Sequence, residues 1–122
     1  MQKTKILIVD DSPQTRKSLR NILEKHNYEV VGEAGSGIEA IKQYNLLSPD
    51  IIMLDIIMPQ LGGIETLRML HSINKEIKII MVSALDSMDR VKECLKAGAN
   101  YYILKPFEEE KILESINKVL AK

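Results

Sequence analysis

Short apolar runs rich in isoleucine and valine recur along the chain and alternate with longer segments of helical periodicity. The runs are too short for helices, and polar or turn-forming residues follow each of them. They predict five strands, at about residues 5–9, 28–33, 50–55, 77–82 and 101–104. The intervening segments repeat apolar residues every three or four positions, which predicts five helices, at 13–25, 38–47, 64–73, 88–97 and 108–120.

This alternation predicts an α/β fold, a three-layer sandwich in which helices cover both faces of one parallel five-stranded sheet. The third and fourth apolar runs lack the alternation of a sheet with one wet face, so we place both strands in the sheet interior. Ser12 and Pro13 suit the N-cap and first turn of the first helix. Gly98 suits the end of the fourth helix.

The composition predicts one domain that spans residues 1–122, because 45% hydrophobic content is sufficient for a single core. Lys plus Arg number 17 and Asp plus Glu also number 17, so no charge excess favours direct binding of nucleic acid or membrane. Cys94 is the only cysteine, which excludes an internal disulfide and fits a reducing compartment. We therefore expect a cytoplasmic protein, since the four apolar residues 6–9 are too few for a signal peptide.

Polar side chains follow the predicted strands at the points where they end. Asp10 and Asp11 follow the first strand, Asp55 the third, Ser83 the fourth and Lys105 the fifth. Any one of them is an ordinary loop residue, although Asp55 interrupts an apolar stretch in which an unpaired charge is costly. Parallel strands place their ligands beyond their carboxyl ends. We therefore expect all five residues at one edge of the sheet, where they form a candidate site.

Three neighbouring carboxylates repel one another unless a positive charge lies among them. Oxygen ligands without histidine or cysteine favour Mg²⁺, which commonly shares its site with a phosphoryl group. Lys105 supplies a second positive charge, and Ser83 supplies a donor for a phosphoryl group on an acceptor carboxylate. The set predicts a site for magnesium-dependent phosphoryl transfer.

Four motifs carry a resemblance to a known family: Ile6-Leu7-Ile8-Val9-Asp10-Asp11, Asp50-Ile51-Ile52-Met53-Leu54-Asp55 with Met58-Pro59, Val82-Ser83-Ala84, and Gly98-Ala99 before Lys105-Pro106-Phe107. From about residue 5 to residue 120 the chain resembles the response regulator receiver domains of two-component signalling, the CheY-like receivers. The resemblance implies the flavodoxin-like fold with strand order 2-1-3-4-5. It also implies a signalling protein, not an enzyme, that catalyses its own phosphorylation and dephosphorylation.

By this resemblance Asp55 accepts a phosphoryl group from a histidine kinase, a phosphotransfer protein or a small phosphodonor. Asp11, Asp55 and the backbone carbonyl of Ile57 would ligate Mg²⁺ directly, and Asp10 would act through water. Lys105 would pair with the phosphoryl oxygens.

The resemblance also implies a switch, in which Ser83 turns toward the phosphoryl group and Tyr102 turns inward, and a cis Lys105–Pro106 bond. The output surface would be the fourth helix, fifth strand and fifth helix, which would control a downstream protein in chemotaxis or another pathway. Some apolar residues of this region must belong to the core instead; the set is Met88, Val91, Cys94, Leu95 and Tyr102. We expect a monomer or a weak phosphorylation-linked dimer, because Asn100 and Tyr101 replace the acidic residues of the dimerising DNA-binding subclass.

Four residues depart from the usual family pattern. Ser83 stands where many members have threonine, and it keeps the hydroxyl. Ile57 and Leu85 are apolar where the hydrolytic water would pass, which leads to the hypothesis of a long-lived phosphorylated state. Gly62 replaces the usual Asp or Asn before Gly63.

His26 and His71 are expected to face solvent on helices, without an acid–base role.

Other protein classes fit the sequence less well. A flavodoxin-like electron carrier would need a glycine- or hydroxyl-rich phosphate loop after the first strand, where Asp10-Asp11-Ser12-Pro13 stands. An aspartate-nucleophile phosphatase would carry a second aspartate at position 57, which is isoleucine. We expect a stand-alone CheY-like regulator. A receiver domain excised from a longer regulator and a protein-interaction module without phosphorylation stay open as alternatives.

Overall fold

The computed structural model describes residues 3–121, in which five strands alternate with five helices. The strands are β1 (Lys5–Val9), β2 (Glu29–Ala34), β3 (Ile51–Leu54), β4 (Lys78–Ser83) and β5 (Tyr101–Leu104). The helices are α1 (Pro13–Lys25), α2 (Gly37–Leu47), α3 (Gly63–Ile73), α4 (Met88–Lys96) and α5 (Glu109–Leu120). Every predicted element is present, with ends that agree within one residue, a difference usual where helices and strands fray.

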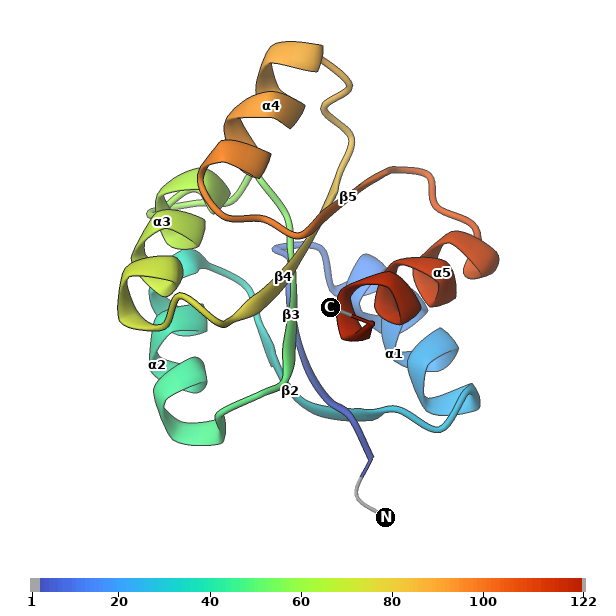
Figure 1. The fold of residues 1–122 in the computed structure, drawn as a ribbon. Coiled ribbons are helices and arrows are strands. Elements are labelled where there is room, and N and C mark those ends of the chain that lie inside the picture. Colours follow the sequence, from blue (N-terminus) through green and yellow to red (C-terminus); the bar gives the residue numbers. More distant parts are fainter. Residues whose placement is uncertain (1–2, 122) are drawn as a thin grey trace.

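The five strands form one parallel sheet of order β2-β1-β3-β4-β5. Helices α1 and α5 cover one face, and α2, α3 and α4 cover the other (Figure 1). The predicted flavodoxin-like three-layer fold and its strand order are confirmed. The interior position of β3 and β4 is also confirmed, and all four residues of β3 are buried.

Each face of the sheet has its own apolar core, because successive strand residues point to opposite sides. Leu7 and Val9 of β1 pack in the core under α2, α3 and α4, with Leu67 and Leu70 from α3. Ile6 and Ile8 pack in the other core, which includes Leu19 and Leu23 from α1 and Ile112, Ile116 and Val119 from α5. The sheet is therefore held on both sides, and the carboxyl ends of its central strands are fixed in position.

Local signals in the sequence place the helix ends as predicted. Ser12 is the N-cap of α1, and its hydroxyl accepts a hydrogen bond from the Thr15 amide at 3.3 Å, with Pro13 in the first turn. Gly98 follows α4 with φ of 118°, a conformation that glycine adopts without strain. The Lys105–Pro106 peptide bond is cis, as the family resemblance implied.

The expectation that both histidines simply face solvent on helices is wrong in part. His26 is the C-cap of α1, and its Nε2 lies 2.6 Å from Oε2 of Glu109, at the start of α5. His71 is partly buried, and its ring lies against Gly98. The contact of His26 joins helices that are far apart in the sequence, so spacing alone does not reveal it.

Within residues 3–121, no helix has the length and apolar character needed to cross a bilayer.

Candidate functional site

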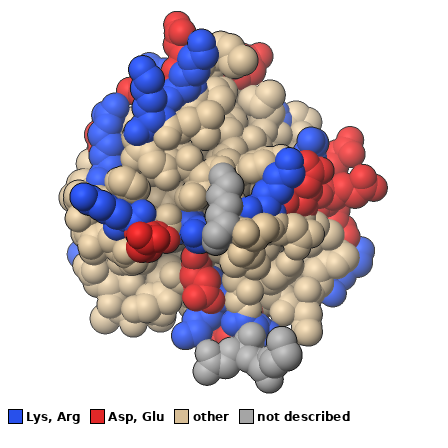
Figure 2. Space-filling model, in the orientation of Figure 1, with Lys and Arg blue, Asp and Glu red and all other residues tan. Residues whose placement is uncertain are grey.

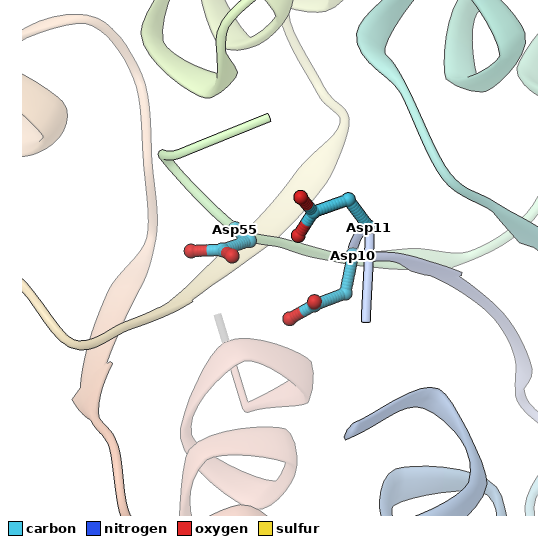
Figure 3. Close-up of side chains that lie close together, drawn as sticks. All are labelled: Asp10, Asp11 and Asp55. Atoms are coloured by element: carbon cyan, nitrogen blue, oxygen red, sulfur yellow. The ribbon is translucent and has the colours of Figure 1, made fainter. Parts of the chain in front are cut away.

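The three predicted aspartates meet at the carboxyl ends of two neighbouring strands. Asp10 and Asp11 follow β1, and Asp55 follows β3. Their side chains lie close together (Figure 3), and a carboxylate oxygen from each lies within 4.8 Å of the others. Asp10 and Asp55 are buried, whereas Asp11 is exposed. The pocket therefore opens to solvent on the side of Asp11.

Asp10 is held by hydrogen bonds at all of its polar groups. Its N–H donates to the carbonyl of Ala34 at 2.9 Å, and its Oδ1 accepts from the Ser12 amide at 2.9 Å. Its Oδ2 accepts from Lys105 Nζ at 2.7 Å. Its carbonyl oxygen accepts from Nη1 of Arg16. Asp10 is thus a fixed acidic group, whereas Asp11 accepts no hydrogen bond from another side chain or amide of residues 3–121.

Asp55 and Lys105 form the electrostatic centre of the pocket. Lys105 Nζ lies 3.3 Å from Oδ2 of Asp55, and the Ile56 amide donates to Oδ1 at 2.7 Å. Burial, together with the charge of Asp10, raises the pKa of Asp55 despite these contacts. Burial would lower the pKa of Lys105, but the hydrogen bond to Asp10 and the charge of Asp55 outweigh it and raise that pKa. Lys105 is accordingly a permanent cation beside two carboxylates.

Gly63, the first residue of α3, supports the loop that carries Asp55. Its N–H donates to the Ile56 carbonyl at 2.7 Å. A Cβ at this position would overlap the backbone of Asp55 and Ile56. The absence of a side chain therefore lets the start of α3 pack directly against the loop that carries Asp55.

Ser83 and Tyr102 meet at the loop after β4. Ser83 is buried, and its hydroxyl accepts a hydrogen bond from the Leu85 amide at 3.3 Å. The hydroxyl of Tyr102 donates to the Leu85 carbonyl at 2.6 Å. Burial raises the pKa of the Tyr102 phenol, an effect that a hydrogen bond with Ser83 partly offsets. Both hydroxyls therefore contact the same short segment between β4 and α4.

The remaining predicted ligand, Ile57, lies two residues beyond Asp55 with its side chain 59% exposed. The role of its carbonyl stays a prediction. Arg16 is the site residue that the sequence reasoning missed. The available signal was a cation in the first turn of the helix that follows an aspartate pair. The contact of Arg16 with Asp10, however, depends on the direction in which the Arg16 side chain leaves α1.

The donor set fits Mg²⁺. Carboxylate oxygens alone converge, without sulfur or imidazole, and this is the ligand type that Mg²⁺ prefers. The exposure of Asp11 leaves room for the waters that Mg²⁺ usually keeps. Asp10, Asp11 and Asp55 are thus able to hold the ion together with a phosphoryl group.

The sequence model of the response regulator receiver domain matches residues 6–117. The chain belongs to this family. Its sequence is 43% identical to that of the chemotaxis protein CheY of Thermotoga maritima over 115 residues, which cover 94% of this chain and 96% of that protein. It is 41% identical to CheY of Bacillus subtilis, over 95% of this chain and 97% of that protein.

Among solved structures, the receiver domain is similar to one chain in the crystal structure of the CheX-CheY-BeF₃-Mg²⁺ complex from Borrelia burgdorferi. The TM-score is 0.94 at 37% identity, over 97% of this chain and 90% of that chain. The chain is therefore a CheY-like receiver domain, and it has the acidic pocket typical of phosphoacceptor response regulators. Receiver domains of this kind are signalling modules and not classical enzymes.

Proposed function

We propose that the receiver domain accepts a phosphoryl group on Asp55 and, in that state, controls a downstream protein of a two-component pathway. The single observation that carries the proposal is the position of Asp55. Its buried carboxylate lies within 4.8 Å of carboxylate oxygens of Asp10 and Asp11, and it shares the Lys105 ammonium with Asp10. The phosphodonor would be a histidine kinase, a phosphotransfer protein or a small acyl phosphate, and the domain would act in the cytoplasm.

The chemistry is a displacement at phosphorus. A carboxylate oxygen of Asp55 attacks the phosphorus atom and forms a P–O bond, while the bond from phosphorus to the donor's nitrogen or oxygen breaks and the donor keeps the electron pair. Lys105 Nζ, 3.3 Å from the carboxylate, stabilises negative charge on the phosphoryl oxygens. Hydrolysis of the acyl phosphate by water returns Asp55 to its resting form.

Asp11, Asp55 and the carbonyl of Ile57 would hold Mg²⁺ directly. The ion, when bound, neutralises charge on the phosphoryl oxygens and among the carboxylates. Both carboxylate oxygens of Asp10 already accept hydrogen bonds, from Ser12 and Lys105. This supports a role for Asp10 through water instead of direct ligation.

Ser83 and Tyr102 would transmit the change. The Ser83 hydroxyl is held to Leu85 by one long hydrogen bond of 3.3 Å, so it is easily released to a phosphoryl oxygen. Tyr102 holds the other side of Leu85, through its carbonyl, at 2.6 Å. Movement of Ser83 would therefore shift the segment that leads into α4.

The output surface would be formed by α4, β5 and α5. Lysines and arginines lie over α4 in Figure 2, acidic side chains lie toward α5, and much of the surface between them is uncharged. Met88, Leu95 and Leu104 are exposed there by 68%, 47% and 47%. A surface depression of about 360 Å³ lies along β5 and the start of α5. Cys94 is buried and belongs to the core, whereas Val91 and Tyr102 are partly buried. These features suit a protein partner.

Intact-mass analysis after incubation with Mg²⁺ and acetyl phosphate tests the phosphorylation. One added phosphoryl group is expected for the wild type, and none for Asp55→Asn or for the wild type with a chelator. Asp86→Asn, the same change at an exposed residue after β4, is the matched control and should be labelled like the wild type. Absence of label under every condition, including with a kinase, would favour an interaction module that is not phosphorylated.

Amide chemical shifts test the switch. Phosphorylation of the wild type should shift resonances in α4 and β5 more than those in α2. Ser83→Ala should accept the phosphoryl group but show smaller shifts in α4. Equal shifts in the wild type and Ser83→Ala would remove Ser83 from the switch. The proposal concerns the receiver itself, and it applies both to a stand-alone regulator and to a receiver within a longer protein.

A further inference from the structure

Arg16 joins the metal-binding loop to the edge of the sheet. Its Nη1 donates to the carbonyl oxygen of Asp10, and its Nε donates to Oε1 of Glu33 on β2 at 2.9 Å. The Arg16 backbone is fixed in the first turn of α1, where its N–H donates to the Ser12 carbonyl at 3.1 Å. The side chain is 20% exposed, so it spans the gap between loop and strand largely out of water.

The carbonyl that Arg16 holds belongs to the peptide unit between Asp10 and Asp11. A peptide unit is planar, so the direction of its carbonyl also fixes the direction of the Asp11 amide and, with it, the position of the Asp11 Cα. Asp11 itself is exposed, and its carboxylate has no partner among the residues that the structure describes. The orientation of Asp11 toward Asp55 therefore depends on the peptide unit that Arg16 holds.

The other end of Arg16 is equally well fixed. Glu33 also accepts from Arg20 Nε at 2.7 Å, and Gln43 donates to the Glu33 carbonyl at 2.7 Å. Burial alone would raise the pKa of Glu33, but the hydrogen bonds from Arg20 and Arg16 outweigh it and lower that pKa, so Glu33 is an anion at neutral pH.

The next residue of β2, Ala34, accepts the Asp10 amide at 2.9 Å. Asp10, Arg16 and the end of β2 thus form a closed ring of hydrogen bonds around the loop.

We propose that Arg16 is a positioning residue for the metal site, which orients the Asp10–Asp11 peptide unit so that the Asp11 carboxylate faces the ion. The inference rests on the proposed use of the acidic pocket for Mg²⁺. Arg16 acts on the ion only through the loop, because its guanidinium hydrogen-bonds a carbonyl and a distant carboxylate and none of the three pocket carboxylates.

Two effects of Arg16 on Mg²⁺ have opposite signs, which makes the inference testable. As a cation near a cation site, Arg16 repels Mg²⁺, so its removal would tighten binding if charge were its only effect. As a positioning residue it favours Mg²⁺, so its removal weakens binding. Arg16→Lys keeps the charge, but a single ammonium cannot reproduce the fork of donors that reaches both Asp10 and Glu33.

The experiment measures Mg²⁺ affinity by isothermal titration calorimetry, without a phosphodonor, for the wild type, Arg16→Gln, Arg16→Lys and Arg20→Gln. Arg20→Gln is the matched control, because it removes the same charge from α1 and the same contact with Glu33 but does not touch Asp10. Thermal unfolding of each variant identifies a temperature at which all of them are folded.

Both Arg16 variants should bind Mg²⁺ roughly tenfold more weakly, the size of effect seen when groups that orient metal ligands are removed. Arg20→Gln should stay close to the wild type. In the metal-free protein, amide exchange at Asp11 and Ser12 should be faster in the Arg16 variants only.

Three results would overturn the inference: unchanged or tighter binding by Arg16→Gln, wild-type binding by Arg16→Lys, or equal weakening by Arg20→Gln. Failure of the proposed function would appear separately, as absence of a phosphoryl label on a wild-type protein that still binds Mg²⁺.

Discussion

Replacing Asp55, the proposed phosphoacceptor, tests how the charges of the pocket balance. Asp55→Asn removes one negative charge, but the amide carbonyl is still able to accept the hydrogen bond from Ile56. Asp55 is 6% exposed, so its ionised form has lost most of its hydration. We expect the metal-free variant to be more stable than the metal-free wild type.

The magnitude follows from three terms. At an effective dielectric constant of about 20, the Asp10 carboxylate within 4.8 Å repels Asp55 by about 3.5 kcal/mol. The exposed Asp11 adds about 1 kcal/mol, because its charge is screened by water. Lys105, at 3.3 Å, attracts Asp55 by about 5 kcal/mol.

The repulsion and the attraction nearly cancel, so the desolvation of Asp55 decides whether the substitution stabilises or destabilises the protein. Burial of an ion costs several kcal/mol, and burial of an amide costs less. The net gain from Asp55→Asn is about 1–2 kcal/mol in the free energy of unfolding, which corresponds to roughly 4–8 °C in Tm for a chain of this size.

Urea unfolding at neutral pH with a chelator provides the measurement, and Asp86→Asn is the control at an exposed position. A second series contains saturating Mg²⁺, which stabilises the wild type by mass action and the variant less. The advantage of Asp55→Asn should therefore shrink or reverse. A metal-free variant less stable than the wild type would refute the reasoning, because it would mean that the attraction of Lys105 exceeds repulsion and desolvation together.

Three further predictions concern the same pocket. Because the pKa of Asp55 is raised on folding, folded protein binds this proton more tightly than the unfolded chain, so metal-free stability should fall as pH rises from the ordinary aspartate range through the raised pKa. Urea unfolding across this pH range should show the fall in stability for the wild type but not for Asp55→Asn. Parallel stability curves for the two proteins would contradict the prediction. Gly63→Ala should lose about 2 kcal/mol or more of stability through overlap with the backbone of Asp55 and Ile56. Gly62→Ala, where the nearest atom is a flexible side chain, should change thermal stability little, and equal losses would argue against the overlap. Ile57→Asn with Leu85→Glu should speed loss of the phosphoryl group by a factor on the order of ten, because polar side chains orient the attacking water. An unchanged or slower rate by intact-mass analysis would reject the idea of a long-lived phosphorylated state.

The order of elements was predictable because the strands are short apolar runs, of which β1, β3 and β4 are buried on both faces, and each helix repeats its apolar residues regularly. Ser12 and Pro13 even located the start of α1. The aspartates were predictable for a related reason: strand ends in a parallel sheet share one edge, so Asp10, Asp11 and Asp55 had to converge once the strands were placed.

Contacts between side chains of different elements were not predictable. Arg16 reaches Asp10 only because α1 packs across the end of β1, and His26 meets Glu109 only because α1 and α5 lie on the same face of the sheet. The need for glycine at position 63 has the same origin, since it comes from the approach of α3 to the loop after β3. Such contacts depend on distances of a few ångströms in three dimensions, which residue order does not encode locally.

The shallow attachment of α4 has a consequence for how a signal spreads. Of its residues only Cys94 is fully buried, whereas α3 has five buried residues and α5 has four. A helix that hides so little apolar surface gives up little hydrophobic free energy when it slides or tilts, whereas a comparable shift of α3 or α5 would open one of the two cores. The sheet and its other helices are then able to stay in place while α4 takes up a second position. Separating a fixed framework from one weakly attached helix would let the proposed phosphoryl group on Asp55 reshape a protein surface without endangering the fold.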